Sequence, residues 1–182
     1  MIFEELNNEN IDMAIKIQHD IFPVENGSED LKDSLNGLPE YYSVLKYWLP
    51  KVDGKVVGIC GIYAYKLYPK DAWLGWFGVI DDERRKGYAT EILSFVTEKA
   101  KEMGFNALRL YTDEQDNVSA VKLYKKLNMI DEVYSNEEDS HFEISKTLIF
   151  SKSLNDEPVK LWNNKNLFLN AHDEKNMKEL NQ

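Results

Sequence analysis

The stretch VIDDERRKGYATEI, residues 79–92, sets three basic residues in a row directly before a glycine. Apolar residues precede this basic cluster, and apolar positions with helical spacing follow it. The cluster contrasts with the rest of the chain, which carries 32 acidic and 22 basic side chains and a net charge of −10. The order of strand, basic loop, glycine and helix predicts a site for an anionic ligand at the start of a helix.

The physical basis of such a site is the first helical turn. A helix that begins near Gly87 leaves the backbone N–H groups of its first turn unpaired, and its dipole favours anions there. Gly87 permits backbone conformations closed to other residues and leaves room for a ligand, while Ala89 is small and Thr90 adds a hydroxyl. The basic residues 84–86 raise the local potential. The alternative is a solvated basic loop before an ordinary helix.

Composition limits the protein class. A length of 182 residues suits one domain, or one domain with a small extension. No apolar run approaches the ~20 residues that span a bilayer, and the acidic N-terminus has no signal-peptide pattern. The single cysteine, Cys60, lies in an apolar run and is expected to be a core thiol of a cytoplasmic protein. A sequence pI near 4.8 argues against general nucleic-acid binding.

Hydrophobic periodicity outward from the basic cluster predicts a mixed α/β fold. The expected strands are 2–6, two within 42–65 joined by a turn at Asp53-Gly54, 72–80, 107–112 and a late region within 141–154. The expected helices are one after Asn7 or Asn8, a short one around 29–35, 87–103 ending before Gly104, and 117–127. The order strand–helix–strand–helix in the middle implies a right-handed crossover between parallel strands.

The C-terminal residues 154–182 are rich in asparagine but also hold several large apolar side chains. This content is too apolar for a disordered tail. We expect a domain over residues 1–153 and an extension over 154–182 that packs on that domain or on a second subunit of a homodimer.

Two segments resemble the GCN5-related N-acetyltransferase (GNAT) family. Residues 84–89, RRKGYA, match its R/Q-x-x-G-x-G/A motif. Residues 116–129, DNVSAVKLYKKLNM, resemble its N-x-x-A-x-x-L-Y-x-K-x-G-F segment, with Asn117, Ala120, Leu123 and Tyr124 in register. The match is close over residues 72–130 and extends to element order over residues 2–65. The departures are Asp81 where proline is frequent, Asn128 for glycine and Met129 for phenylalanine.

The resemblance implies the family's fold and donor. That fold is a mixed, mostly antiparallel central sheet with a parallel strand pair at the cofactor site, flanked by helices. The donor is acetyl-CoA, whose pyrophosphate the loop amides bind, while Val79 lies where the family lines the pantetheine. The implied acetyl-CoA-binding residues are Val79, Arg84, Arg85, Lys86, Gly87, Tyr88, Ala89, Thr90 and Asn117, and no metal site is expected.

The implied activity is transfer of an acetyl group to a primary amine by direct attack. Asn117 and Tyr124 are seven residues apart, so they lie on one helix face about 10 Å apart. A tyrosine of pKa ~10 is protonated at neutral pH and can give a proton to the departing thiolate. Tyr124 matches the family's general acid. The general base stays open between Glu114, Asp113, Asp81 and a water chain, because strand 73–79 contains no carboxylate.

The acceptor is indicated only by charge. Residues 1–50 contain ten acids and three lysines, and residues 131–143 contain six acids and no lysine or arginine. The early helical region offers aromatic and acidic side chains, namely Tyr41, Tyr42, Phe22, Glu25, Glu29 and Asp30. Acidic walls with aromatics suit a cationic amine, either a small molecule or a peptide. Ordinary surface acidity is the alternative.

Two other function classes fit the sequence less well. A non-catalytic acetyl-CoA-binding sensor or interaction module would need the phosphate loop but not Tyr124, so the tyrosine favours an enzyme. A nucleoside-triphosphate enzyme is disfavoured because the chain contains no G-x-x-x-x-G-K-[ST] motif.

Overall fold

The structure is a computed structural model, and it describes residues 1–115, 117–135, 147–163, 165 and 167. Its described strands are β1 (Ile2–Glu5), β2 (Tyr42–Val52), β3 (Lys55–Val56), β4 (Gly58–Tyr65), β5 (Asp71–Val79), β6 (Ala107–Asp113), β7 (Ile130–Val133) and β8 (Thr147–Ser153). Its described helices are α1 (Ile11–Ile21), α2 (Ser28–Asn36), a short 3₁₀ helix (Asp81–Glu83), α3 (Tyr88–Glu102) and α4 (Val118–Lys126).

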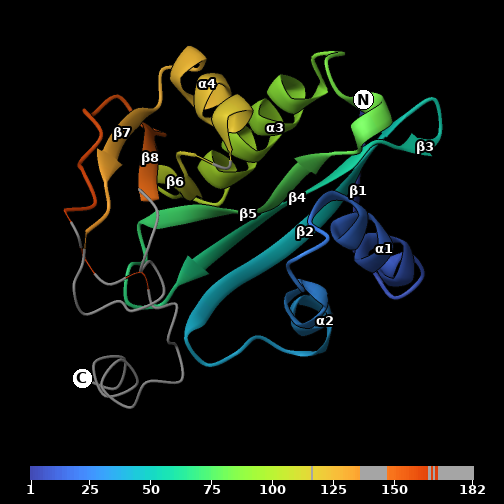
Figure 1. Cartoon of the computed structure of the whole chain (residues 1–182). Coiled ribbons are helices and arrows are strands. Elements are labelled where there is room, and N and C mark those ends of the chain that lie inside the picture. The colour runs from blue at the N-terminus through green and yellow to red at the C-terminus, as the bar shows by residue number, and fades with distance from the viewer. Residues whose placement is uncertain (116, 136–146, 164, 166, 168–182) are drawn as a thin grey trace.

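The strands of the described residues form one sheet in the order β1-β2-β4-β5-β6-β8-β7, with β3 paired to β2 (Figure 1). All described strand pairs are antiparallel except β5 and β6, which are parallel. Helix α3 connects these two strands. The predicted fold class is therefore confirmed, including the parallel pair produced by the strand–helix–strand unit.

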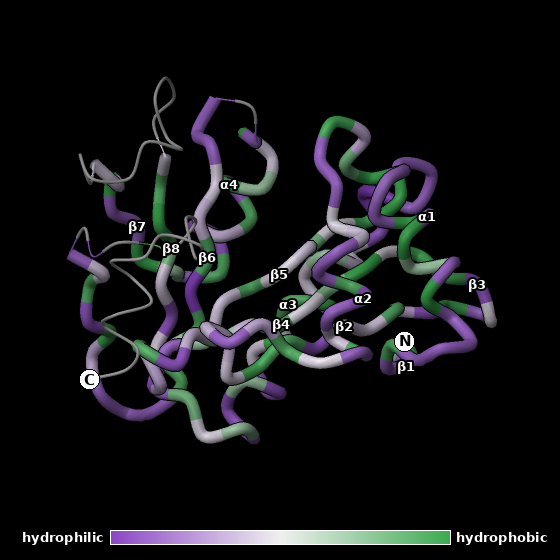
Figure 2. Tube along the Cα trace, turned by 90° about the horizontal axis from the view of Figure 1, so that it is seen from below, coloured by the Kyte–Doolittle hydropathy of each residue, from purple (hydrophilic) through white to green (hydrophobic). Residues whose placement is uncertain are grey.

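The helices cover both faces of the sheet. Helices α3 and α4 lie on one face and α1 and α2 on the other (Figure 1). The apolar stripe of α3, with Ile92, Val96 and Ala100 fully buried, packs over the sheet and forms the larger core. In Figure 2, polar and apolar residues alternate along α1, as expected for a helix with one buried side. No helix in the described part of the chain has the length and apolar character needed to cross a membrane.

Two helix ends match the sequence prediction closely. Gly104 follows α3 with a φ of +85°, and Asn128 follows α4 with a φ of +57°. Both values lie in the left-handed region, where glycine and then asparagine are the most tolerant residues. Asn128 therefore performs the role for which the family motif has glycine. Cys60 is fully buried, as expected for a core thiol.

A buried ion pair joins β5 to β6 where the two strands are paired. Arg109 Nε donates to Asp71 Oδ1 at 2.7 Å, and the Arg109 Nη1 atom donates to Ser151 Oγ on β8 at 2.6 Å. The guanidinium carbon also lies 5.5 Å from the ring centroid of Trp162. These contacts fasten β5, β6 and β8 together at the end of the sheet opposite the carboxyl end of β5.

Part of the extension lies against the same end of the sheet. Trp162 and Leu167 are buried, and the Trp162 ring meets Trp73 edge to face at 4.9 Å between centroids. The Glu132 carboxylate accepts hydrogen bonds from the backbone N–H groups of Trp162 and Asn163 at 2.6 and 2.8 Å. These contacts join Trp162, Asn163 and Leu167 to the sheet, while the division at residues 153 and 154 stays a prediction.

Candidate active site

The site lies where β5 and β6 separate. These parallel strands are paired only from Asp71 opposite Ala107 to Trp73 opposite Arg109. Beyond that point a cleft of about 630 Å³ opens beside the end of β5, the loop before α3 and the start of α4. The predicted residues that line it are Val79, Arg84, Arg85, Gly87, Tyr88, Ala89, Thr90, Asn117 and Tyr124. Lys86 is the predicted binding residue that does not line the cleft.

Strand β5 carries a β-bulge beside the cleft. Ile59 pairs with Gly78 while Gly61 pairs with Gly75, so β5 has one residue more than β4 in this interval. Trp76, within the bulge, has a positive φ of +34°. A bulge bends its strand and leaves a residue out of the hydrogen-bonded ladder. The bulge therefore redirects the segment that continues into the cleft-lining residues Phe77 to Val79.

The loop before α3 presents an uninterrupted row of backbone donors. Arg85 has a φ of +64° and Gly87 a φ of +89°. The N–H groups of residues 85–89 donate to no acceptor among the described residues, and Gly87 is the N-cap residue of α3. A Cβ atom on Gly87 would meet no atom within 4 Å. Alternating positive φ values and a helix N-terminus form a concave anion site that fits a pyrophosphate.

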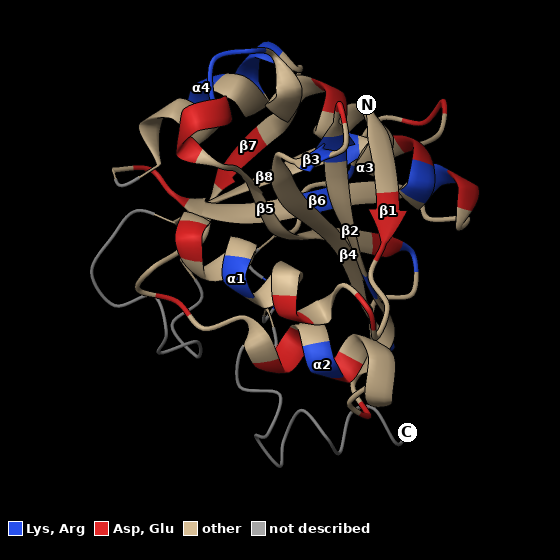
Figure 3. Ribbon diagram, turned by 90° about the vertical axis from the view of Figure 1, so that its right-hand side faces the viewer, with Lys and Arg blue, Asp and Glu red and all other residues tan. Residues whose placement is uncertain are grey.

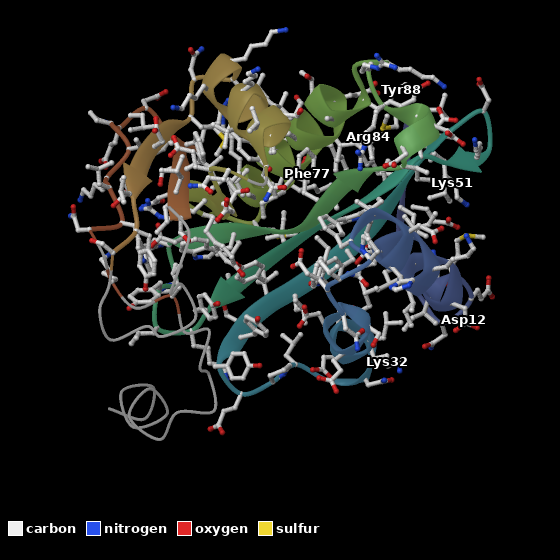
Figure 4. The ribbon with its side chains drawn as sticks, viewed as in Figure 1. Asp12, Lys32, Lys51, Phe77, Arg84 and Tyr88 are labelled. Atoms are coloured by element: carbon white, nitrogen blue, oxygen red, sulfur yellow. The ribbon has the colours of Figure 1, made fainter. Side chains whose placement is uncertain are left out.

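The basic side chains of this loop are held mainly by its own acids. Arg84 donates through Nε to the Val79 carbonyl at 3.1 Å and pairs with Asp81 at 2.7 Å. Lys86 pairs with Glu83 at 2.8 Å. Two of the three predicted cations therefore hold the loop in shape, whereas the Arg85 side chain has no partner among the described residues. Figure 4 shows Arg84 below the loop and Tyr88 at the start of α3.

Glu83 is the central acid of the loop. Its carboxylate bonds Lys86 and also Lys55, the latter at 2.8 Å from the neighbouring hairpin. Hydrogen bonds from Lys55 and then Lys86 lower the pKa of the Glu83 carboxyl. The bond to Glu83 in turn raises the pKa of the Lys86 ammonium. Glu83 lines the cleft, yet its charge is balanced by two lysines and does not oppose an anion.

Tyr124 lies at the other end of the cleft. Its ring is packed between Phe77 and Phe150, with centroids 6.3 and 5.2 Å away, and the residue is 5% exposed. The Tyr124 hydroxyl has no hydrogen-bond partner among the described residues, and burial raises its pKa above the ordinary value of 10.0. Figure 4 shows Phe77 on β5 beneath α4. The hydroxyl is therefore a protonated donor available to a ligand.

Asn117 and Ala120 lie on the same side of α4 as Tyr124, and all three line the cleft. Asn117 occupies the N-cap position, as its sequence context predicts, but its side chain makes no capping hydrogen bond. Its amide is exposed and available for a ligand. The small side chain of Ala120 leaves the cleft open between Asn117 and Tyr124.

The acids that the sequence offered as a general base or as acceptor ligands do not gather at the described cleft. None of Asp81, Asp113 and Glu114 lines the described cleft. Of the acids in residues 131–143, Asp131 pairs with Lys125 and Glu132 holds the extension, while residues 136–143 lie outside the described part. Figure 3 shows acidic residues along α1 and α2, where Asp30 bonds to Trp76.

Several residues of the cleft were not expected from the sequence. Ile21 at the end of α1 and Phe77 and Gly78 on β5 line it, whereas Phe22, which also lines it, was among the side chains expected at the acceptor site. Ile21 is more than fifty positions from Phe77, and each lies in an apolar stretch that is also typical of a core. No local pattern distinguishes them.

Comparison with known proteins agrees with this geometry. The Escherichia coli ribosomal-protein-S18-alanine N-acetyltransferase aligns with a TM-score of 0.66 and 15% identity, covering 88% of this chain and 98% of that one. A putative GNAT acetyltransferase from Desulfovibrio desulfuricans aligns with a TM-score of 0.70 and 13% identity, covering 85% and 99%. An aminoglycoside 6'-N-acetyltransferase complexed with coenzyme A aligns with a TM-score of 0.63 and 15% identity, covering 87% and 100%. No curated protein sequence matches. The sequence profile of the Acetyltransferase (GNAT) family matches residues 11–129.

Proposed function

The chain belongs to the GNAT acetyltransferase family, and we propose that it transfers an acetyl group to a primary amine by direct attack, with Tyr124 as the general acid. It is an enzyme, and acetyl-CoA is its acetyl donor. The observation that carries the proposal is a single cleft bordered by two kinds of hydrogen-bond donor, backbone amides and a phenol. The loop amides of residues 85–89 and the Tyr124 hydroxyl both border this cleft, and neither has a hydrogen-bond partner in the described part of the chain.

The loop would hold the donor through its backbone. The N–H groups of residues 85–89 would bind the pyrophosphate, with the Arg85 side chain and the Thr90 hydroxyl beside it. The Asn117 amide and the Val79 backbone would line the path from the phosphates to the reacting carbon. Neither Arg84 nor Lys86 is needed as a direct ligand, because both stabilise the loop through Asp81 and Glu83.

The donor supplies a thioester carbonyl that an amine nitrogen can attack. The new C–N bond forms, the C–S bond breaks, the nitrogen loses a proton and the sulfur gains one. The bulge leaves Trp76 and Phe77 without register partners on β4, and we propose that a backbone N–H at this bulge stabilises the negative oxygen of the tetrahedral intermediate. Tyr124 would donate its hydrogen bond to the departing sulfur.

The raised pKa of Tyr124 limits how its hydroxyl can assist the departure of the thiolate. A thiol has an ordinary pKa of about 8.5, so full proton transfer from a phenol above pKa 10 to the thiolate is uphill. A strong hydrogen bond to the developing thiolate avoids that cost. The final proton on sulfur can then come from the nitrogen, which must lose one.

The pH dependence of turnover tests this assignment. Burial raises the Tyr124 pKa, so the phenol keeps its proton to a higher pH than an exposed tyrosine. A lysine-like amine becomes a better nucleophile as the pH rises towards its own pKa of ~10. We expect kcat/KM for the amine to rise up to about pH 10 without a falling limb from Tyr124. A falling limb near pH 8 or 9 that disappears in Tyr124→Phe would contradict the raised pKa.

The acceptor is proposed to be cationic. Glu25 and Glu29 are exposed near the end of the cleft formed by Ile21 and Phe22, on the face that carries acidic residues in Figure 3. Two structural neighbours are named for a ribosomal-protein alanine and for aminoglycosides. Both names specify acetyl transfer to nitrogen, and they support a peptide N-terminus or a small polycation as the acceptor class for this chain.

A coenzyme A release assay across a panel of amines tests the function. We expect acetyl transfer to cationic amines, with a KM that rises with salt because exposed charges are screened beyond about 10 Å at 0.1 M. The double variant Glu25→Gln/Glu29→Gln should raise the KM for the cationic amine but not for a neutral amine of similar size. An efficient acceptor whose KM ignores both salt and this variant would make the acidity an ordinary solvated surface.

A cytoplasmic location is part of the same proposal. The single cysteine is buried and unpaired, as is usual where thiols stay reduced.

A further inference from the structure

The end of α1 contacts β5 at the side of the cleft that we propose for the acceptor. A Cβ atom on Gly78 would lie 2.5 Å from Ile21 Cγ2 and 3.3 Å from Phe22 Cζ. Only glycine allows this approach, so the helix end rests on the backbone of β5. Ile21, Phe22 and Gly78 all line the cleft. The placement of the turn after α1 therefore decides the shape of the cleft beside the reacting carbon.

Trp76 holds that turn from within the bulge. Its indole Nε1 donates to Asp30 Oδ2 at 2.8 Å, across 46 positions of sequence. Its ring meets Phe22 edge to face, with centroids 5.2 Å apart. A Cβ atom on Gly27 would lie 2.5 Å from Trp76 Cε2, so the turn packs directly on the ring. Gln18, buried in α1, steadies the turn by donating to the Glu25 carbonyl at 3.2 Å.

Stability alone does not account for a carboxylate at this position. Burial raises the pKa of Asp30, only partly offset by the bond from Trp76, and the acids Asp33 and Glu29 raise it further. A raised carboxyl pKa means that the folded state favours the protonated form. Folding stability then falls as the pH rises through that pKa, so the charge opposes folding at neutral pH. What the buried Asp30 carboxylate provides in return is the acceptor for the Trp76 hydrogen bond.

We propose that Asp30 is a positioning residue for acetyl transfer, acting through Trp76 to fix the turn between α1 and α2 against the bulge of β5. The proposal rests on the acetyltransferase function given above. Asp30 belongs to α2, which starts at Ser28, and Trp76 directly precedes Phe77 on β5. The pair thus couples the acceptor-side helices to the strand that carries the reacting centre (Figure 1).

The physical reason is the short range of the reaction. The nucleophile must come within about 3–3.5 Å of the thioester carbon, and a displacement of ~1 Å can cost 10²-fold in rate. If the turn moves, Ile21 and Phe22 no longer define the acceptor approach. None of the contacts of Trp76 and Asp30 among the described residues involves the loop amides of residues 85–89, so donor binding should not change.

Four variants test the pair. Trp76→Phe removes the donor but keeps a ring, and Asp30→Ala removes the acceptor. Asp30→Asn retains an amide oxygen that can accept the bond, and Asp33→Ala removes another acid of α2, one that does not line the cleft, as the matched control. We expect Trp76→Phe and Asp30→Ala to lower kcat between about 10- and 100-fold with the acetyl-CoA Kd within about twofold. Asp30→Asn and Asp33→Ala should retain most of kcat.

The double variant Trp76→Phe/Asp30→Ala sharpens the test. Both single changes remove the same hydrogen bond, so the double variant should be no slower than the slower single variant. Additive losses would contradict a shared role. Loss of activity in Asp30→Asn equal to that in Asp30→Ala would show that the charge, and not the bond, is required, and would also overturn the proposal.

Hydrogen–deuterium exchange tests the coupling without any acceptor. Residues 21–30 and 74–80 should both exchange faster in Trp76→Phe and in Asp30→Ala, and neither should change in Asp30→Asn or Asp33→Ala. Unchanged exchange in both segments would overturn the proposal even in an active enzyme. A wild-type protein that binds acetyl-CoA but acetylates no amine would instead contradict the proposed function, and exchange would still decide the coupling.

Discussion

Tyr124→Phe should slow acetyl transfer by between about 10²- and 10⁴-fold while leaving the fold and the affinity for acetyl-CoA unchanged. The phenylalanine ring keeps the packing against Phe77 and Phe150. The hydroxyl has no hydrogen-bond partner among the described residues, so its removal leaves no buried group unpaired. Turnover with the best amine, under conditions in which chemistry limits the rate, is the measurement.

The matched control is Tyr68→Phe. Tyr68 lies between β4 and β5, at the end of β5 opposite Val79, and its ring packs on Trp162. Removing that hydroxyl should leave turnover within about twofold of the wild type, since it lies outside the cleft. Equal turnover in Tyr124→Phe and the wild type would remove Tyr124 from the mechanism. A water molecule that replaces part of the hydroxyl's function would give a loss near the lower bound.

The sequence predicts the middle of the fold well because its signals there are local. The apolar stripe of α3, the glycine that ends it and the Asn128 end of α4 are all set by neighbours within a few residues. Strand β7 was missed for the opposite reason. Ile130–Val133 is a short edge strand whose two apolar residues are half exposed, so its pattern does not alternate between buried and exposed positions.

The basic cluster shows how local charge modifies a motif. Sequence reasoning placed Arg84, Arg85 and Lys86 together as phosphate ligands. The structure pairs the first and third with acids three positions earlier, Asp81 and Glu83. That spacing was visible in the sequence, since residues three apart are neighbours on a helical turn. The loop is therefore stabilised by its own ion pairs and offers its backbone N–H groups to a ligand. Beside them lies the Arg85 side chain, which has no partner among the described residues.

The bulge of β5 and the Trp76–Asp30 bond could not be predicted. The sequence WLGWFGV, residues 73–79, is continuously apolar, and nothing in it marks which residue leaves the ladder. The bulge is defined only by the pairing with β4. From the sequence, Asp30 was expected only as one of several acids in the wall of an acceptor site. Its distinct role follows from tertiary packing, where Gly27 admits the Trp76 ring.

Gly87→Asp should abolish acetyl-CoA binding. Gly87 lines the cleft and a Cβ atom there would meet no atom within 4 Å, so we expect a carboxylate at this position to compete for the concave site. The N–H groups of residues 85–89 would then meet an internal anion, and a pyrophosphate would be repelled at short range. Calorimetric titration with acetyl-CoA should show no measurable binding, while thermal unfolding confirms that the variant is folded.

Two further variants separate charge from backbone strain. Gly87→Asn has nearly the same shape as aspartate without its charge, and asparagine tolerates positive φ. It should weaken binding far less than Gly87→Asp. Gly104 has a φ of +85°, close to the +89° of Gly87, and its Cβ position is also open, but it lies at the far end of α3. Gly104→Asp should therefore bind acetyl-CoA like the wild type. If Gly87→Asp also binds like the wild type, the loop amides do not hold the pyrophosphate, and the donor must enter the cleft by another route.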